Sequence, residues 1–338
     1  MVRTLKNILQ RIKRIFQFWS EIIFAKNRFG ISLLQRIRAL MMGGFTPDQY
    51  VLFDLENNNP KDYISRLEEI KMRAVNSPFK QIVNNRIVCI EAFGHYLKVQ
   101  RIFGRIDNEG RLVSNCRELR QLSDIDSLLE QQGTLLFRKT WGRQQRRITK
   151  EDGVYSFGDG RIFSDWDWLK RLRNWRILEH VTPHGYLGDL QRKVPPTIKI
   201  IAFRDPKSSE WKIAFAVHRA PSSDGRLTSK VNLETGTLTN AIRLNTGDEF
   251  FVHPDTLLPF EGLEIPHWQK VKDDIVAASS NFCFLYYLVY TIVVTEDGFT
   301  VVNTKASTEL TSTQVWGGQA NQELGDFFRA HGLLKKRS

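Results

Sequence analysis

A short hairpin near the C-terminal end of the chain leaves polar side chains where an apolar strand finishes. The stretch TIVVTEDGFTVVNTKAS, residues 291–307, combines two hydrophobic strands with a Glu-Asp-Gly turn at 296–298. Asp-Gly between two β-branched runs is a strong signal for a hairpin. The second strand ends in Asn303, Thr304 and Lys305. Such groups can hold a metal, hold a substrate or face only solvent, and their types alone do not choose between the three.

A second group of residues that could take part in binding or catalysis is basic. The segment LLFRKTWGRQQRRI places Lys139 near the end of a predicted strand and three arginines, Arg143, Arg146 and Arg147, after it. Guanidinium forks clamp phosphate through paired hydrogen bonds. Binding of another anion and a solvated basic loop fit the same pattern, so these interpretations stay open.

The composition is that of a folded globular protein. The chain has 338 residues, of which 41% are hydrophobic and 25% are charged, and its net charge is +12. An excess of positive charge attracts anions such as nucleotides, nucleic acid or an acidic membrane face. The three cysteines, Cys89, Cys116 and Cys283, are far apart, which argues against a disulfide framework or a CxxC metal site. We therefore expect a reducing compartment and a cytoplasmic protein.

Residues 1–26 form a distinct basic and amphipathic segment. Apolar residues recur at three- and four-residue spacing from Leu5 to Ile23, as on one stripe of a helix. Charged residues interrupt the apolar run, which argues against a transmembrane span, and no small-residue cleavage site follows. Two interpretations remain. The more frequent one is a helix that packs its stripe on the protein body. The other is a helix lying on an anionic membrane at the cytoplasmic face.

The sequence pattern predicts a helical first part of the chain and a strand-rich remainder. Thr46 is a predicted N-cap with Pro47 at the first helical position, and Ser123 and Gly133 are predicted to start and stop a later helix. Mixed antiparallel sheets carrying helices follow, which is an α+β organisation. The expected helices are 62–73, 86–97, 123–133, 165–175, 265–289 and 321–334. The expected strands fall within 99–113, 134–141, 153–164, 175–181, 197–205, 211–220, 229–244 and 291–307.

Several stretches together resemble the sugar-transfer-associated branch of the ATP-grasp superfamily. HPDTLLPFEGLEIPHW, residues 253–268, is similar to that branch's His-Pro-Asp-Thr … Phe-x-Gly … Ile-Pro-x-Trp block. The resemblance runs from about Gly44 to the end of the chain. Its other parts are LEHVTPHGYL (178–187), PPTIKIIAF (195–203), VNLETGTLTNAI (231–242) and the hairpin of 291–307.

The resemblance implies an ATP-grasp fold of the α+β class, in which two α+β lobes surround a nucleotide cleft. We expect a helical N-terminal region at 1–80, a small lobe with phosphate loop and hinge at 81–185, and a large lobe at 186–338. The implied chemistry uses ATP and Mg²⁺ to activate a carboxylate as an acyl-phosphate, which an amine or similar nucleophile attacks. The family further implies a role in surface-polysaccharide or secondary-metabolite biosynthesis, with a nucleotide and an unidentified carboxylate substrate as partners.

The resemblance also implies which residues meet the phosphates. Lys139 matches the phosphate lysine on a small-lobe strand, and Arg86 stands where a second lysine is expected. Arg143 lies in the phosphate loop, where this chain has one glycine in place of several. Glycines there let backbone amides approach phosphate, so arginine side chains would have to replace those amides.

Further roles fall on the hinge and on the large lobe. Glu179, His180 and Val181 match the hinge whose backbone meets adenine. Lys199 stands where the family has an arginine on the following strand. Arg219 matches a large-lobe arginine that faces phosphate or the acyl-phosphate, and is therefore a predicted catalytic residue.

The end of the 291–307 hairpin, where the resemblance places the metal ligands, departs from the family pattern. The positions of its Asp, Glu and Asn ligands fall on Thr291, Asn303 and Lys305. Neutral oxygens bind Mg²⁺ far more weakly than carboxylates, and an ammonium group repels it. We therefore name Thr291 and Asn303 as metal candidates that lack the usual carboxylates, and Lys305 as a catalytic candidate that neutralises phosphate in place of a metal.

Two alternatives to the ligase remain. The first is a degenerate ATP-grasp protein that binds a nucleotide or partner without turnover, which the altered loop and metal end favour. The second treats the basic surface as the function, because WDWLKRLRNWR interleaves aromatic and basic residues. Its aromatic residues have helical spacing, which is more typical of a buried face, and the chain has no nucleic-acid-binding signature. Nucleic acid is not an expected partner.

Overall fold

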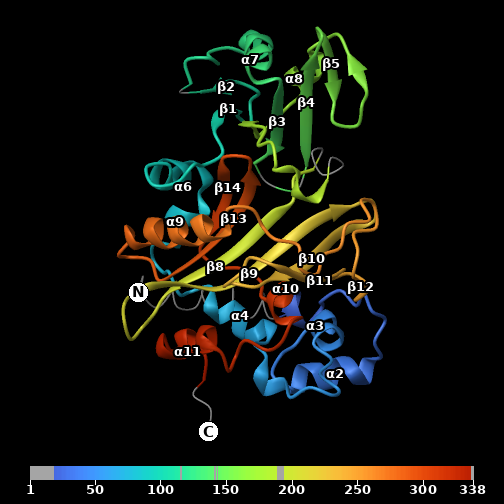
Figure 1. Ribbon diagram of the computed structural model, residues 1–338, viewed down its shortest axis with the longest axis vertical. Helices are drawn as coiled ribbons and strands as arrows, with labels where there is room; N and C mark the ends of the chain where they lie inside the picture. The colour runs from blue at the N-terminus through green and yellow to red at the C-terminus, as the bar shows by residue number, and fades with distance from the viewer. Residues whose placement is uncertain (1–18, 115, 141, 143, 189–193, 336–338) are drawn as a thin grey trace, which may run out of the picture.

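Two antiparallel sheets, one above the other, organise the molecule (Figure 1). The computed structural model describes residues 19–114, 116–140, 142, 144–188 and 194–335. The small sheet has the strand order β2-β1-β7-β3-β4-β5-β6, and the large sheet has the order β12-β11-β10-β9-β8-β13-β14. The expected α+β class with two lobes is confirmed.

The small lobe is built from residues that alternate between the two faces of its sheet. Phe103, Phe137 and Ile177 point to one face, where they pack with α7 (Ile125–Gln132) in a closed core. The other face is free of that core. The strands are β1 (Ile102–Ile106), β2 (Leu112–Val113), β3 (Thr134–Lys139), β4 (Gln145–Glu151), β5 (Val154–Phe157), β6 (Ile162–Phe163) and β7 (Trp175–Glu179).

The large lobe buries both faces of its sheet. Ile198 and Ile200 point to a core shared with α5 (Lys80–Asn84), α6 (Arg86–Phe93) and α9 (Trp268–Ser280). Ile201 and Phe203 point to the opposite core, formed with α4 (Arg66–Met72), α10 (Thr311–Gln314) and α11 (Glu323–Ala330). The strands are β8 (Thr197–Arg204), β9 (Trp211–Ser222), β10 (Gly225–Val231), β11 (Leu238–Ile242), β12 (Glu249–Phe250), β13 (Tyr287–Thr295) and β14 (Gly298–Lys305).

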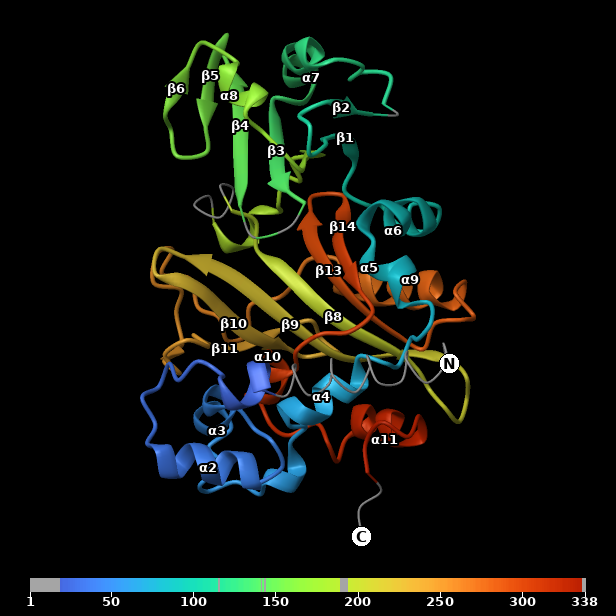
Figure 2. The ribbon, with the colours of Figure 1, turned by 180° about the vertical axis from the view of Figure 1, so that it is seen from behind.

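The N-terminal helices sit on the far side of the large lobe from the small lobe, as Figure 2 shows from behind. Thr46 caps α3 (Pro47–Leu52), with Pro47 at the first helical position as predicted. α2 (Leu33–Met41) lies beside α3, and Ala39 of α2 and Tyr50 of α3 belong to one small core. None of the helices in the described part of the chain has the length and apolar character needed to cross a membrane. The predicted stripe before Trp19 lies outside the described residues.

Several predicted element boundaries were wrong. α7 begins after Asp124 rather than Ser123, because a 3-10 turn at Leu122–Asp124 precedes it. The helix predicted over 165–175 is only α8 (Asp167–Lys170), since Trp175 already starts β7. The helix predicted over 62–73 is a 3-10 turn at Pro60–Asp62 followed by α4.

The largest error concerns the segment predicted as one helix over 265–289. The helix α9 ends at Ser280, and β13 begins at Tyr287. Leu288 and Tyr287 lie in the two different cores, so this strand is buried on both faces. A strand buried on both faces has an apolar run without alternation, which cannot be told from a buried helix by pattern alone.

Asn76 fastens the N-terminal helices to the large sheet. Its side chain is buried, its Nδ2 donates to the carbonyl oxygens of Tyr287 and Ala306, and its Oδ1 accepts from the amides of Tyr286 and Tyr287. Removing a buried side chain leaves its backbone partners unsatisfied. We predict that Asn76→Ala lowers the free energy of unfolding by about 2–4 kcal/mol.

Urea denaturation followed by far-ultraviolet circular dichroism measures this change. The exposed Asn108 in the β1–β2 turn provides the matched control, for which Asn108→Ala should change the free energy by less than about 0.5 kcal/mol. Equal effects of the two variants would contradict the bridging role of Asn76.

Candidate functional site

A row of arginines crosses the face of the small sheet that lies opposite its core. Arg138 in β3 lies directly opposite Arg176 in β7, which in turn lies opposite Arg105 in β1. Because side chains alternate along a strand, these residues face away from the core that holds Phe137 and Ile177. The sheet therefore presents three cations on one side.

The same side approaches the large lobe. The pKa of Arg138 is lowered, first by burial and then by the charge of Arg226 in β10. Burial, followed by the charge of Arg226, also lowers the pKa of Arg219 in β9 to about 10. Arg226 thus lies close to Arg138 of the small lobe and to Arg219 of the large lobe. The arginine face of the small sheet and the large sheet therefore approach each other near Arg226.

Arg86 joins this group from the start of α6. Burial lowers its pKa to about 9, and the charges of Arg176 and Arg138 add to the effect. We call Arg86, Arg138, Arg176, Arg219 and Arg226 the arginine cluster. It draws on α6, β3, β7, β9 and β10, and so on both lobes.

The arginine cluster has no internal counter-charge. Among the residues that the structure describes, none of the five has a carboxylate within ion-pair distance, although Glu309 lies near enough to oppose the fall in the pKa of Arg219. The buried Nε atoms of Arg86 and Arg176 have no hydrogen-bond partner. Arg226 is exposed and the other four are half-buried. Half-buried cations without a nearby carboxylate are costly, so a bound anion would stabilise the cluster.

The predicted phosphate lysine lies on the other side of the sheet. Lys139 follows Arg138 in β3 and pairs with Trp175, which belongs to the small-lobe core. Strand alternation therefore directs Arg138, rather than Lys139, to the face of the arginine cluster. Arg138, Arg176 and Arg226 had no sequence motif to distinguish them from other strand arginines.

The loop after Lys139 is shorter than predicted, because β4 begins at Gln145. Arg146 lies opposite Phe137 and stacks over the rings of Trp168 and Trp175, at 5.6 and 5.7 Å from their centroids. Arg147 lies opposite Leu136, and so on the face of the arginine cluster. Arg143, a predicted cofactor residue, lies outside the described residues.

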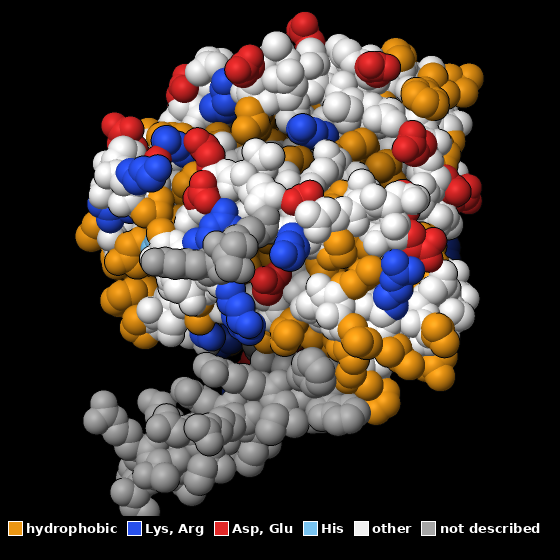
Figure 3. All heavy atoms as spheres, turned by 90° about the horizontal axis from the view of Figure 1, so that it is seen from below, with side chains coloured by type: hydrophobic (Ala, Val, Ile, Leu, Met, Phe, Trp, Pro, Cys, Tyr) orange, Lys and Arg blue, Asp and Glu red, His pale blue; other side chains and the backbone are white. Residues whose placement is uncertain are grey.

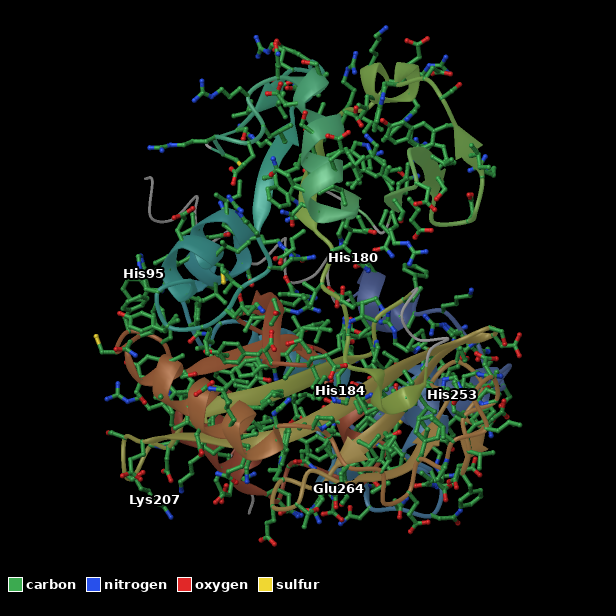
Figure 4. All side chains as sticks on the ribbon, turned by 45° about the horizontal axis from the view of Figure 1, so that its top comes forward. His95, His180, His184, Lys207, His253 and Glu264 are labelled. Atoms are coloured by element: carbon green, nitrogen blue, oxygen red, sulfur yellow. The ribbon has the colours of Figure 1, made fainter. Side chains whose placement is uncertain are left out.

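The predicted hinge connects the two lobes. Figure 4 shows His180 at this junction. His180 is half-buried, and its pKa is lowered by burial and then by the charge of Arg147. Val181 is buried, while Glu179 ends β7 and its Oε2 accepts a hydrogen bond of 3.0 Å from the amide of Arg101.

Gln100 ties this hinge to the arginine cluster. Its Nε2 donates to the carbonyl oxygen of Glu179 at 2.7 Å, and its Oε1 accepts from Arg86. Its own amide donates to the carbonyl oxygen of Val301 in β14 at 2.9 Å. One buried glutamine therefore positions the hinge, the first residue of α6 and the large sheet relative to one another. The sequence alone held no signal for this role.

Thr291 and Asn303 face each other across the hairpin that was predicted to hold a metal, and Lys199 pairs with Thr291 from β8. Lys199 is only 1% exposed, and its Nζ donates to Ser312 Oγ at 2.7 Å. Burial, together with the charges of Arg219 and Lys305, lowers its pKa well below the usual range. The hydrogen bond from its Nζ to Ser312 fastens β8 to α10, while Lys305 is exposed.

The residues present at the hairpin end do not fit Mg²⁺. Their side chains offer one hydroxyl, one amide and one ammonium group, and no carboxylate. Glu296, in the turn at the opposite end of the strands, lies 3.4 Å from His184 instead. Among the described residues, no group of three or more His, Cys, Asp or Glu side chains is arranged to hold a metal ion.

One protein-family model matches part of the chain. The model of the sugar-transfer associated ATP-grasp family matches residues 170–324, which confirms the predicted resemblance for that part of the chain. No curated protein matches the chain.

Solved structures of ATP-grasp proteins match more weakly. The ATP-grasp ligase PsnB complexed with minimal precursor has a TM-score of 0.45 at 13% identity, over 76% of this chain and 63% of that one. The ADP complex of purK, an N5-carboxyaminoimidazole ribonucleotide synthetase, has a TM-score of 0.40 at 15% identity, over 73% and 54%. The Staphylococcus aureus N5-carboxyaminoimidazole synthetase with ADP has a TM-score of 0.36 at 8% identity, over 68% and 45%. The chain thus spans less than two thirds of each.

The repulsion within the arginine cluster makes a prediction about stability. Arg176→Gln removes a cation that has no carboxylate partner, so this variant should be more stable than the wild type at low salt, with a Tm higher by about 1–3 °C. Added inorganic triphosphate should raise the Tm of the wild type more than that of the variant, because it supplies the missing counter-charge.

Differential scanning calorimetry measures both effects. The control is Arg111→Gln, since Arg111 is exposed and pairs with Asp107 and Glu109, and its loss should leave the Tm unchanged or slightly lower. A fall in Tm for Arg176→Gln, or equal triphosphate-induced shifts in Tm for the wild type and Arg176→Gln, would contradict an anion site without a carboxylate partner.

Proposed function

We propose, from the membership of residues 170–324 in the sugar-transfer associated ATP-grasp family, that the chain binds ATP between its two lobes and activates a carboxylate. The observation that carries the proposal is the arginine cluster, which joins both lobes and has no carboxylate partner in the described structure. A triphosphate supplies several negative charges within the reach of such a cluster. A cytoplasmic location fits a protein that uses ATP.

Each part of ATP has a proposed contact. The adenine would lie against the backbone of Glu179–Val181, in the hinge that Gln100 braces. The phosphates would lie between the small-lobe arginines and Arg219, with the exposed Lys305 at the far end. The alternation of β3 favours Arg138 over the neighbouring Lys139 as the phosphate contact.

The proposed reaction follows from the family. A carboxylate oxygen of the substrate attacks the γ-phosphorus, the bond from that phosphorus to the bridging oxygen breaks, and ADP leaves. The acyl-phosphate carbon is then attacked by an amine or similar nucleophile, and phosphate leaves. Arg219 and Lys305 would stabilise the negative charge on the transferring group, as fixed cations do in phosphoryl transfer. We propose surface-polysaccharide or secondary-metabolite biosynthesis as the setting.

A second function has its own support. The hairpin end has Thr291, Asn303 and Lys305 where the family has metal ligands, and these residues do not fit Mg²⁺. A chain that keeps phosphate contacts and lacks the metal ligands would bind nucleotide, or a partner, without turnover. Metal independence of binding is common to both proposals, and release of ADP separates them.

The neighbouring cations in β3 provide a matched pair of variants. We predict that Arg138→Ala weakens ATP binding by about 10–100-fold, because a charged hydrogen-bonding group is lost from the phosphate site. Lys139→Ala should weaken it by less than about threefold, since its side chain lies on the core side of the sheet. Isothermal titration calorimetry, with Mg²⁺ and with a chelator, should give the same Kd for the wild type within about threefold.

The outcomes separate the candidates. Slow release of ADP favours the carboxylate-activating enzyme, and binding without release favours the nucleotide-binding protein. Binding that requires Mg²⁺ would contradict the predicted metal independence. A larger loss of affinity in Lys139→Ala than in Arg138→Ala would overturn the assignment of phosphate contacts. The absence of ATP binding in both buffers would exclude both functions.

A further inference from the structure

The helix α2 leaves a strip of large apolar side chains uncovered. Leu33, Leu34 and Met41 are 72%, 79% and 81% exposed, and Ile37 between them is 48% exposed. At 100° per residue these four fall within one arc of about 100° on the helix. The opposite side of α2 carries the buried Ala39, which holds the helix to the small core shared with α3. The strip is therefore presented outward by a helix whose other face is docked.

A second segment of the chain lies beside α2. Phe24 is 72% exposed, and its neighbour Ile23 accepts a hydrogen bond of 3.0 Å at its carbonyl oxygen from Arg36 Nη2. This bond holds the chain around Phe24 beside α2. We call Leu33, Leu34, Ile37 and Met41 the apolar strip. Figure 3 shows hydrophobic side chains gathered at the lower right of this view, the side of the molecule on which α2 lies.

Basic residues border the apolar strip. On the helical wheel Arg38 lies about 40° beyond Leu34, and Arg36 lies about 60° beyond Leu33 on the opposite flank. Lys26, two residues after Phe24 in the chain, is exposed. The segment LLQRIRALM of α2 contains two arginines and no acidic residue. An apolar band with cations on both flanks is the pattern of a helix that lies in a lipid interface, where long basic side chains reach the headgroups.

The charge of the chain indicates which kind of surface the apolar strip contacts. The first eighteen residues, which lie outside the described structure, contain five Lys or Arg and no Asp or Glu in their sequence, and the whole chain has a net charge of +12. Such a charge attracts an anionic surface and would repel a second copy of the same chain. We propose that the apolar strip and its flanking cations dock this protein on an anionic lipid surface. This inference does not depend on nucleotide binding.

Sedimentation of the full-length protein with lipid vesicles tests the proposal. The protein should pellet with vesicles of phosphatidylcholine mixed with phosphatidylglycerol, less with phosphatidylcholine alone, and less at high salt. The double variant Leu34→Glu with Met41→Glu should lower the partition coefficient on the anionic vesicles by at least about tenfold, because it places two negative charges in the apolar strip. Arg38→Gln should lower it on anionic vesicles only.

A matched control lies on the small lobe. Ile162 in β6 is 74% exposed, and Ile162→Glu makes the same kind of substitution far from α2. It should leave partitioning unchanged, and the melting temperatures of all variants show whether they fold. Equal partitioning of wild type and the double variant would overturn the proposal. So would a wild-type dimer in light scattering that the double variant converts to a monomer without change in vesicle binding, since the strip would then join two copies.

Discussion

The electrostatic repulsion among five arginines between the two lobes is the constraint on which the rest of the structure depends. Arg86, Arg138, Arg176, Arg219 and Arg226 come from five different elements and gather without a carboxylate partner in the described structure. A fold does not maintain such an arrangement for its own stability, since neighbouring cations in a half-buried space oppose one another. The packed cores of the two lobes supply the stability that this repulsion removes, and an anion would return part of it.

Strand alternation and one buried side chain position the site. Arg138 and Arg176 face the large lobe because Phe137 and Ile177, their neighbours in sequence, face the small-lobe core. Gln100 fixes the hinge by binding both Arg86 and the carbonyl of Glu179. Hydrogen bonds close to the arginine cluster therefore fix the position of one lobe relative to the other, so a change at the hinge would also move the arginines of the cluster.

The sequence predicted the architecture better than the site. Local signals were sufficient where one residue decides the backbone, as in the Thr46 cap of α3 and the Asp-Gly turn of the hairpin. They failed at β13, whose apolar run is buried on both faces and resembles a buried helix. The motif match selected Lys139, whereas strand alternation places Arg138 on the face of the arginine cluster; a motif assigns a position in the chain, and the face of a strand depends on where the neighbouring side chains are packed. Gln100 and Arg226 act through partners distant in sequence, which no local pattern reveals.

The most direct test of this account is a structure of the protein with a non-hydrolysable ATP analogue and Mn²⁺, recorded with the anomalous signal of manganese. The account predicts phosphate oxygens within hydrogen-bond distance of Arg86, Arg138, Arg176 and Arg219, and no manganese peak bounded by Thr291 and Asn303. A manganese ion held by those two residues and bridging the phosphates would contradict it, as would an analogue bound away from the arginine cluster.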